Sequence, residues 1–315
     1  MRISDGFSRG AYRLRAVIAR YHALLNDYAL SFLLGIVEGL TEFLPVSSTA
    51  HLRIAEALLG IDLADGYWKM FSIVIQLGAI LCLPIYFWKR IMSFFATYPG
   101  GTRGDKTAIT HPLALTAIAF VCTAAPAFVL TKVIGKNLES LKLISIALIL
   151  GGIVMWIVDS KLGNRNVPAY ETAVDEVERM TMPQAIWIGL CQILSAVFPG
   201  TSRSMSTIAA GQIAGLSRTA ALEFSFLLSI PTMAAATGYD LLKTLRPSKS
   251  AEPVAPLHVD AHGWILLAIG FVVSFFVAWA VVAWFMNWVR KRGFAPFAIY
   301  RIGVGVAVLT WALSK

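Results

Sequence analysis

The sequence predicts an all-α polytopic membrane protein with about six transmembrane helices and two re-entrant helical hairpins in an inverted-topology repeat. Three observations lead to this fold class. Of the 315 residues, 57% are hydrophobic and only 14% are charged, whereas a soluble domain carries about 25% charged residues. Apolar runs long enough to cross a bilayer recur along the whole chain. A shorter apolar motif, interrupted by proline and hydroxyl residues, occurs twice.

The predicted spans are apolar runs of about the 20 residues that a membrane crossing requires. They cover residues 70–88, 112–131, 141–158, 219–239, 263–289 and 294–314. Residues 28–315 are therefore expected to form a single membrane domain. Its parts are a first repeat at 28–158, a polar linker at 159–181 and a second repeat at 182–315. The basic extension at 1–27 is either an interfacial helix or a disordered segment.

The first interrupted motif lies at residues 28–59 and reads as two short helices. Glu38 and Glu42 are four residues apart, which places both carboxylates on one face of the first helix, one turn apart. Pro45 ends that helix. Neither half is long enough to span, so the pair predicts a re-entrant hairpin buried by other helices.

The second helix of this hairpin begins with hydroxyl residues that suit an N-cap. These are Ser47, Ser48 and Thr49. His51 follows in the first turn, on the same side as Ser48. His51 is either a nucleophile or a general acid/base. Ser48 is the alternative nucleophile, and both serines also suit a purely capping role.

The second motif carries the features of an anion site. Residues 184–198 form a short apolar helix, Pro199 and Gly200 turn the chain, and a new helix begins at about Ser202. A helix N-terminus favours a phosphate, and Arg203 adds a guanidinium that matches phosphate oxygens. An arginine inside an apolar segment is functional by default, although pairing with a hairpin glutamate would also explain it. The predicted phosphate-binding residues are Ser47, Thr49, Gly200, Thr201, Ser202, Arg203, Ser204 and Thr207.

The two motifs align as an internal repeat, with Pro45 opposite Pro199 and Ser48 opposite Ser202. Three spans separate them, and an odd number of spans inverts the second copy, so both hairpins are expected to meet near the midplane. The basic loops at 89–111 and 290–292 are expected to be cytoplasmic. The first hairpin would then open to the outside.

Together these residues are the parts of metal-assisted phosphoryl transfer. Glu38 and Glu42 cannot both stay ionised in a low-dielectric site unless a metal cation or an arginine neutralises them. A divalent metal that bridges carboxylate and phosphate oxygens would do so. A transporter or lipid flippase is the alternative function, because inverted repeats also build carriers. Basic residues scattered between apolar spans argue against a nucleic-acid partner.

At these residues the chain resembles the undecaprenyl-diphosphate phosphatase family, the bacitracin resistance proteins of the bacterial inner membrane. The segments E-G-L-T-E-F-L-P-V-S-S-T-A-H, from residue 38, and P-G-T-S-R-S-M-S-T, from residue 199, match its two signature regions. The resemblance implies that Glu38, Glu42, His51 and Arg203 are functional positions, with Ser48 nearby.

The resemblance also implies the reaction, which is hydrolysis of undecaprenyl diphosphate, a long-chain isoprenyl diphosphate lipid, to the monophosphate. This reaction recycles the lipid carrier for peptidoglycan synthesis and gives resistance to bacitracin. A divalent cation, Mg or Ca, and a site that faces the periplasm are implied as well. The sequence leaves open whether the protein is a monomer or a homodimer.

Overall fold

The computed structural model describes residues 27–61, 66–130, 140–163, 174, 176–245 and 259–314. The predicted extension at 1–27 lies outside this part of the chain except for its last residue. Residues 164–173 and 175 of the predicted linker at 159–181 also lie outside it.

The described residues form helices and no named β-strand, as the sequence predicts. Six helices among them are long and apolar enough to cross a membrane. They lie within a few residues of the six predicted spans, which confirms a multi-pass membrane protein. These helices are α4 (Gly66–Tyr86), α6 (Pro112–Val129), α8 (Leu141–Leu162), α11 (Arg218–Leu245), α12 (Ala261–Arg292) and α13 (Ala295–Leu313).

Two pairs of shorter helices occupy the positions of the predicted hairpins. They are α2 (Asp27–Thr41) with α3 (Ser48–Leu59), and α9 (Met182–Val197) with α10 (Arg203–Ile213). None of the four has the length of a span, because they contain 15, 12, 16 and 11 residues. Their entry and exit on one side of the membrane stays a prediction.

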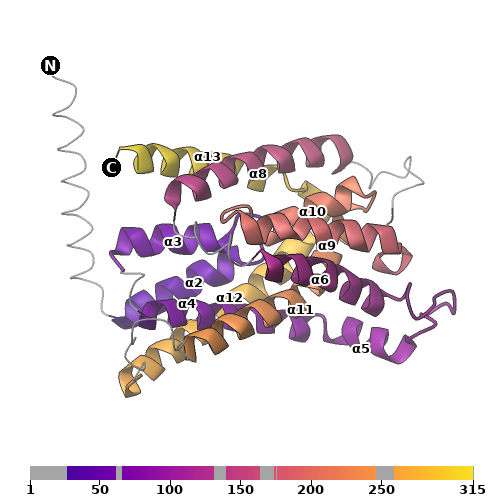
Figure 1. Cartoon of the computed structure of the whole chain (residues 1–315), viewed down its shortest axis with the longest axis horizontal. Coiled ribbons are helices and arrows are strands. Elements are labelled where there is room, and N and C mark those ends of the chain that lie inside the picture. Colours follow the sequence, from indigo (N-terminus) through magenta and orange to yellow (C-terminus); the bar gives the residue numbers. More distant parts are fainter. Residues whose placement is uncertain are drawn as a thin grey trace.

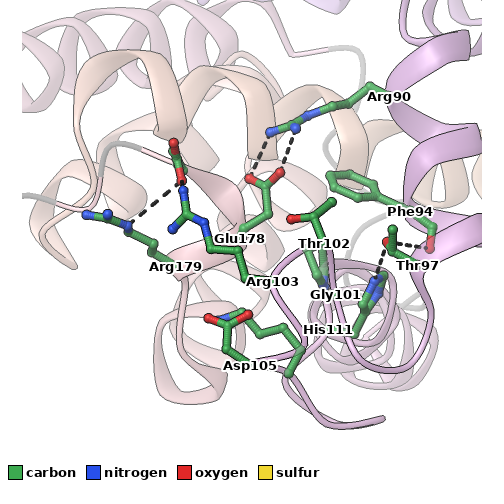
Figure 2. Close-up of a pocket in the computed structure, with 13 residues that line it drawn as sticks. Arg90, Phe94, Thr97, Gly101, Thr102, Arg103, Asp105, His111, Glu178 and Arg179 are labelled. Carbon is green, nitrogen blue, oxygen red and sulfur yellow. Dashed lines mark hydrogen bonds and ion pairs between the residues drawn. The ribbon is translucent and has the colours of Figure 1, made fainter.

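The region predicted as a basic loop at 89–111 contains one helix that the sequence reasoning missed. Helix α5 (Trp88–Thr97) directly follows α4. Phe94 of α5 is buried, while Arg90 forms ion pairs with Glu178 and Glu223. Part of the predicted basic loop is therefore an amphipathic helix. The short 3-10 helix η2 (Val177–Arg179) contains Glu178, the partner of Arg90 (Figure 2).

Each short pair packs against a span of the opposite half of the chain. Helix α2 contacts α12, and α9 contacts α6. Both contacts use a glycine, because a Cβ on Gly35 would lie 2.8 Å from the Gly270 carbonyl oxygen, and one on Gly189 would collide with the Ala119 carbonyl oxygen. Figure 1 shows α8 and α13 side by side, and α4 contacts α11. This exchange of partners has the pattern of an inverted repeat, although the repeat boundaries stay a prediction.

Helix α10 runs through the interior of the bundle. Nine consecutive residues from Ser204 to Gln212 are buried. The core around it includes Phe43, which follows α2, and Phe226 of α11, whose rings lie 5.5 Å apart. The end of the first helix pair and the start of α10 therefore share one core, which places the two motifs close together.

Candidate active site

The turns inside the two short helix pairs end in serines with the same unusual backbone. Ser47 is the N-cap of α3 with φ of 75°, and Ser202 is the N-cap of α10 with φ of 73°. Each serine accepts a hydrogen bond from a backbone N–H three residues on, at Ala50 and Met205. A positive φ is uncommon for a residue with a Cβ and costs energy unless the surroundings impose it. Both turns thus end in a serine with a strained backbone that caps the helix that follows.

This geometry shifts the alignment of the two motifs by one residue. The sequence pairs Ser48 with Ser202, whereas the N-cap positions pair Ser47 with Ser202. The reason is that the turn after Pro199 has one residue more than the turn after Pro45. The pairing that the prolines suggest is therefore wrong at the start of the second helices.

Three of the predicted catalytic residues are in direct contact. Ser48 Oγ donates a hydrogen bond to Glu42 Oε2 at 2.5 Å, and Arg203 Nη2 donates to Glu42 Oε1 at 3.3 Å. Glu42 directly follows α2, Ser48 begins α3 and Arg203 begins α10. The Glu42 and Arg203 side chains are only 3% and 10% exposed. The two motifs, 161 positions apart at this ion pair, therefore meet at one buried carboxylate.

Arg203 retains donors for a further acceptor. Its Nε and Nη1 atoms are buried and have no hydrogen-bond partner in the described part of the chain. The residue also stands at the N-terminus of α10, where backbone N–H groups and the helix dipole favour an anion. A phosphate could therefore bind to Arg203 while Glu42 stays in place.

Glu38 is the most enclosed of the predicted site residues. It lies in the last turn of α2 with 0% exposure, and neither carboxylate oxygen has a hydrogen-bond partner among the described residues. Glu42 and Glu56 act on it electrostatically as like charges, and Arg203 as an opposite charge. Such a group needs a proton or a further cation.

The donor set around Glu38 fits a divalent cation of the predicted kind. No three His, Cys, Asp or Glu side chains of the described residues form a metal-binding group. Mg²⁺, however, is usually held by one or two carboxylates together with substrate phosphates and water. The unpartnered carboxylate of Glu38, with Glu42 beside it, matches that arrangement.

His51 lies on α3, and its ring nitrogens contact Ser47 and Tyr300. Its Nδ1 lies 2.7 Å from the Ser47 carbonyl oxygen, and its Nε2 lies 2.9 Å from the Tyr300 hydroxyl oxygen. The two rings are stacked with centroids 5.6 Å apart. Because a carbonyl oxygen only accepts, Nδ1 carries the proton, and in the neutral ring Nε2 accepts from Tyr300. The carboxylate in contact with Ser48 is that of Glu42, and the choice between Ser48 and His51 as nucleophile stays a prediction.

Two predicted phosphate ligands use their hydroxyls within the fold. Ser204 Oγ donates to the Leu44 carbonyl oxygen at 3.1 Å, and Thr207 Oγ1 lies 2.6 Å from Ser225 Oγ. Both therefore hold α10 against its neighbours. The remaining predicted members lie in the turns or directly after them: Ser47, Thr49, Gly200, Thr201 and Ser202. Of these, Thr49 is exposed and Thr201 is partly exposed.

Sequence reasoning missed two residues of α13 that reach the site. Tyr300 contacts His51, and Arg301 donates hydrogen bonds to the carbonyl oxygens of Pro45 at 2.9 Å and Thr201 at 2.8 Å. A charged residue within an apolar span is a functional candidate by itself. That signal could have found Arg301. Nothing comparable marks Tyr300, since tyrosine is common near membrane interfaces.

A separate polar cavity of about 230 Å³ lies between α5, the α5–α6 loop and η2, and Figure 2 shows it. Arg90 donates to Glu178 at 2.8 Å and to Glu223 at 2.7 Å, while Arg103 pairs with Glu176. These cations are thus already paired, and no predicted site residue lines the cavity. It is distinct from the cluster around Glu42.

The chain is similar to known proteins over nearly its whole length. A protein of Koribacter versatilis named undecaprenyl-diphosphatase is 68% identical over 292 residues, which cover 92% of this chain and 100% of the relative. Relatives with the same name from Rhizobium etli and Caldanaerobacter subterraneus are 41% and 40% identical over 290 and 285 residues. These alignments cover 91% and 90% of this chain, and 98% and 96% of the relatives.

The family comparison covers most of α2 and α13 and the whole of the other short helices and spans. Residues 31–307 match the model of the family described as bacitracin resistance protein BacA. The matched range includes Glu42, Ser48, Arg203 and Arg301, whose contacts join the two motifs. The chain belongs to the bacitracin resistance protein BacA family.

Proposed function

We propose that this protein hydrolyses undecaprenyl diphosphate to undecaprenyl phosphate and inorganic phosphate. The single observation that carries the proposal is the contact of Glu42 with both Ser48 and Arg203, which joins a hydroxyl, a base and a phosphate-binding cation. The relatives named undecaprenyl-diphosphatase support the same substrate. The reaction returns the lipid carrier to cell-wall synthesis and gives resistance to bacitracin.

Arg203 and the first turn of α10 bind the terminal phosphate. Nε and Nη1 of Arg203 donate to its oxygens, while Nη2 remains on Glu42. Backbone N–H groups at the start of α10 add donors that are fixed before substrate arrives. The isoprenyl chain extends into the surrounding membrane.

Ser48 Oγ attacks the terminal phosphorus. Its proton passes to Glu42 Oε2, 2.5 Å away, and the bond between phosphorus and the bridging oxygen breaks, so undecaprenyl phosphate leaves with the electron pair. Water then attacks the phosphoserine, Ser48 regains a proton from Glu42, and dihydrogen phosphate leaves. His51 keeps the acid/base role predicted from the sequence and acts through Nε2, the nitrogen that faces Tyr300.

Glu38 and Glu42 would hold a divalent cation, Mg or Ca, beside the bound phosphate. A bound divalent cation neutralises charge that develops on the phosphate oxygens. Glu38 suits this role best, since Glu42 already accepts hydrogen bonds at both oxygens.

We place the protein in the bacterial inner membrane with the α2–α3 end open to the periplasm. The basic residues Arg290, Lys291 and Arg292 end α12, and the α5–α6 loop carries Arg103 and Lys106. Figure 1 places α5 at the end of the molecule opposite the C-terminus. Basic loops favour the cytoplasm, which orients the α3 end outward.

The test is release of inorganic phosphate from undecaprenyl diphosphate by the purified protein, with and without a chelator. Hydrolysis that the chelator stops and Mg²⁺ restores is the expected result. A protein that moves the lipid between leaflets of a vesicle without releasing phosphate would instead be a carrier, the alternative function that the repeat suggests.

Replacing Glu38 with glutamine is expected to raise the Mg²⁺ concentration for half-maximal phosphate release by at least about tenfold, because the amide removes the charge that holds the cation. A magnesium titration of the variant measures this midpoint. Glu178→Gln is the matched control, since Glu178 pairs with Arg90 away from the site. An unchanged midpoint with a lower rate would remove Glu38 from the metal site.

A further inference from the structure

Arg301 lies in the N-terminal half of span α13 and reaches both turns of the site. It has 0% exposure. Nη1 donates to the Pro45 carbonyl oxygen at 2.9 Å, in the first turn. Nη2 donates to the Gly200 and Thr201 carbonyl oxygens at 3.0 and 2.8 Å, in the second turn, and lies 3.4 Å from the Ala147 carbonyl oxygen. One guanidinium thus bridges backbone segments that are about half the chain apart.

The fold makes room for this side chain at α8. A Cβ on Gly151 would collide with Arg301 Nη2 and would come within 2.8 Å of Met205 Cε. The adjacent Gly152 also faces α13, but a Cβ there would meet Ile302 Cγ1 at 2.7 Å and the Ala298 carbonyl oxygen at 2.9 Å. Gly151 therefore faces the guanidinium, and Gly152 faces the helix that carries it.

The charge of Arg301 has no carboxylate partner among the described residues. Its hydrogen bonds all go to carbonyl oxygens, and its Nε atom has no partner there. The structural arginines differ, since Arg218 pairs with Asp159 at 2.8 Å and Arg90 pairs with two glutamates. A buried arginine without a counter-ion is costly. Arg301 also acts electrostatically on His51, so its field reaches the site.

The carbonyl contacts fix the direction of the site's backbone donors. In a trans peptide the C=O and N–H groups point in opposite directions. Because the Thr201 carbonyl points at Arg301, the N–H of Ser202 points away from it. Ser202 and Ser47 also hold the positive φ values that need support from their surroundings.

We propose that Arg301 is the positioning residue of this active site. It locks the turns before Ser47 and Ser202 against each other, so that the N-termini of α3 and α10 stay aligned on one phosphate. Its unpaired charge adds to the positive potential that attracts the diphosphate. This inference rests on the proposed function, because it assigns a role within the same site.

The test compares purified Arg301→Lys, Arg301→Met and Arg218→Met, with kcat, KM and melting temperature measured for each. Lysine keeps the charge but cannot bridge two turns, so we expect kcat to fall at least about tenfold with KM nearly unchanged. Methionine removes the charge as well, so KM is expected to rise too. Arg218→Met is expected to lower the melting temperature and leave both kinetic constants unchanged. Folded Arg301 variants with wild-type kinetics would overturn the inference.

A glycine pair tests the same claim if the Arg301 variants do not fold. Gly151→Ala presses on the guanidinium of Arg301, whereas Gly152→Ala presses first on Ile302 Cγ1 and the Ala298 carbonyl oxygen of α13 and meets Arg301 only at its Cβ, 3.3 Å away. If both variants lower the melting temperature by a similar amount, the fold decrease in kcat is expected to be several times larger for Gly151→Ala than for Gly152→Ala. Equal losses would make Arg301 purely structural.

Failure of the proposed function is separable from failure of this inference. A wild-type protein that releases no phosphate contradicts the proposed function. Arg301 is then judged by the rise in melting temperature that undecaprenyl diphosphate causes. If the lipid no longer raises the melting temperature of Arg301→Met but still raises that of Arg218→Met, the positioning role of Arg301 is supported. If the lipid raises the melting temperature of Arg301→Met as much as that of the wild type, the role is overturned.

Discussion

Ser48→Ala is expected to lose at least about 1,000-fold in the rate of phosphate release, because the variant lacks the attacking oxygen. The Ser48 hydroxyl lies 2.5 Å from Glu42 Oε2, so nucleophile and base are already in hydrogen-bond contact. The measurement is phosphate release at saturating undecaprenyl diphosphate. Acid-quenched wild type incubated with labelled substrate is expected to carry an acid-stable phosphoserine that Ser48→Ala lacks.

Ser145→Ala is the matched control for this prediction. Ser145 is a fully buried serine of α8 whose hydroxyl donates to the Leu141 carbonyl oxygen of its own helix. Its loss is expected to leave the rate of phosphate release unchanged. If Ser48→Ala retained more than about a tenth of the activity, direct attack by water, and not by Ser48, would have to be the first chemical step.

Arg203→Lys is expected to slow phosphate release by about 100-fold or more, within the range found when one preorganised donor is removed. A guanidinium can hold Glu42 with one nitrogen and bind phosphate with the others, whereas an ammonium is a single point charge. Nη2 is on Glu42, and Nε and Nη1 are buried without partners in the described chain. The measurement is kcat/KM for undecaprenyl diphosphate.

Arg90→Lys controls for the general effect of this substitution. Arg90 is an ion-paired arginine of α5 beside the separate cavity. Its variant is expected to keep the wild-type kcat/KM. Near-normal kcat/KM in Arg203→Lys would show that Arg203 only fastens the two helix pairs together.

The sequence predicted the spans because hydropathy and length are local properties. It also predicted Glu42, Ser48 and Arg203 as site residues, since charges and hydroxyls inside apolar segments stand out. It could not show which of them touch, and it did not predict the hydrogen bond between Ser48 and Glu42. The spacing placed Ser48 and His51 on one side of a helix, but the His51 ring turns to Tyr300, a residue 249 positions away.

Arg301 illustrates a different limit of sequence reasoning. Its charge in a span was visible, but its partners are backbone carbonyl oxygens at Pro45, Gly200 and Thr201, 256, 101 and 100 positions away. Every residue has a backbone carbonyl oxygen, so a sequence pattern cannot show which of these oxygens accept hydrogen bonds from Arg301. The shift of one residue between the two motifs, which aligns Ser47 and not Ser48 with Ser202, could not be predicted for a similar reason. The residue that becomes the N-cap after a turn is decided by tertiary packing.

In the proposed mechanism the two helix pairs form one catalytic site through Glu42 and Arg203. A double-mutant cycle on kcat/KM with Glu42→Gln, Arg203→Lys and the double variant tests this coupling, because groups that act as a unit are non-additive. The double variant is expected to be no more than a few times slower than the slower single variant. A double variant whose loss equals the product of the two single losses would contradict it, since the residues would then act independently.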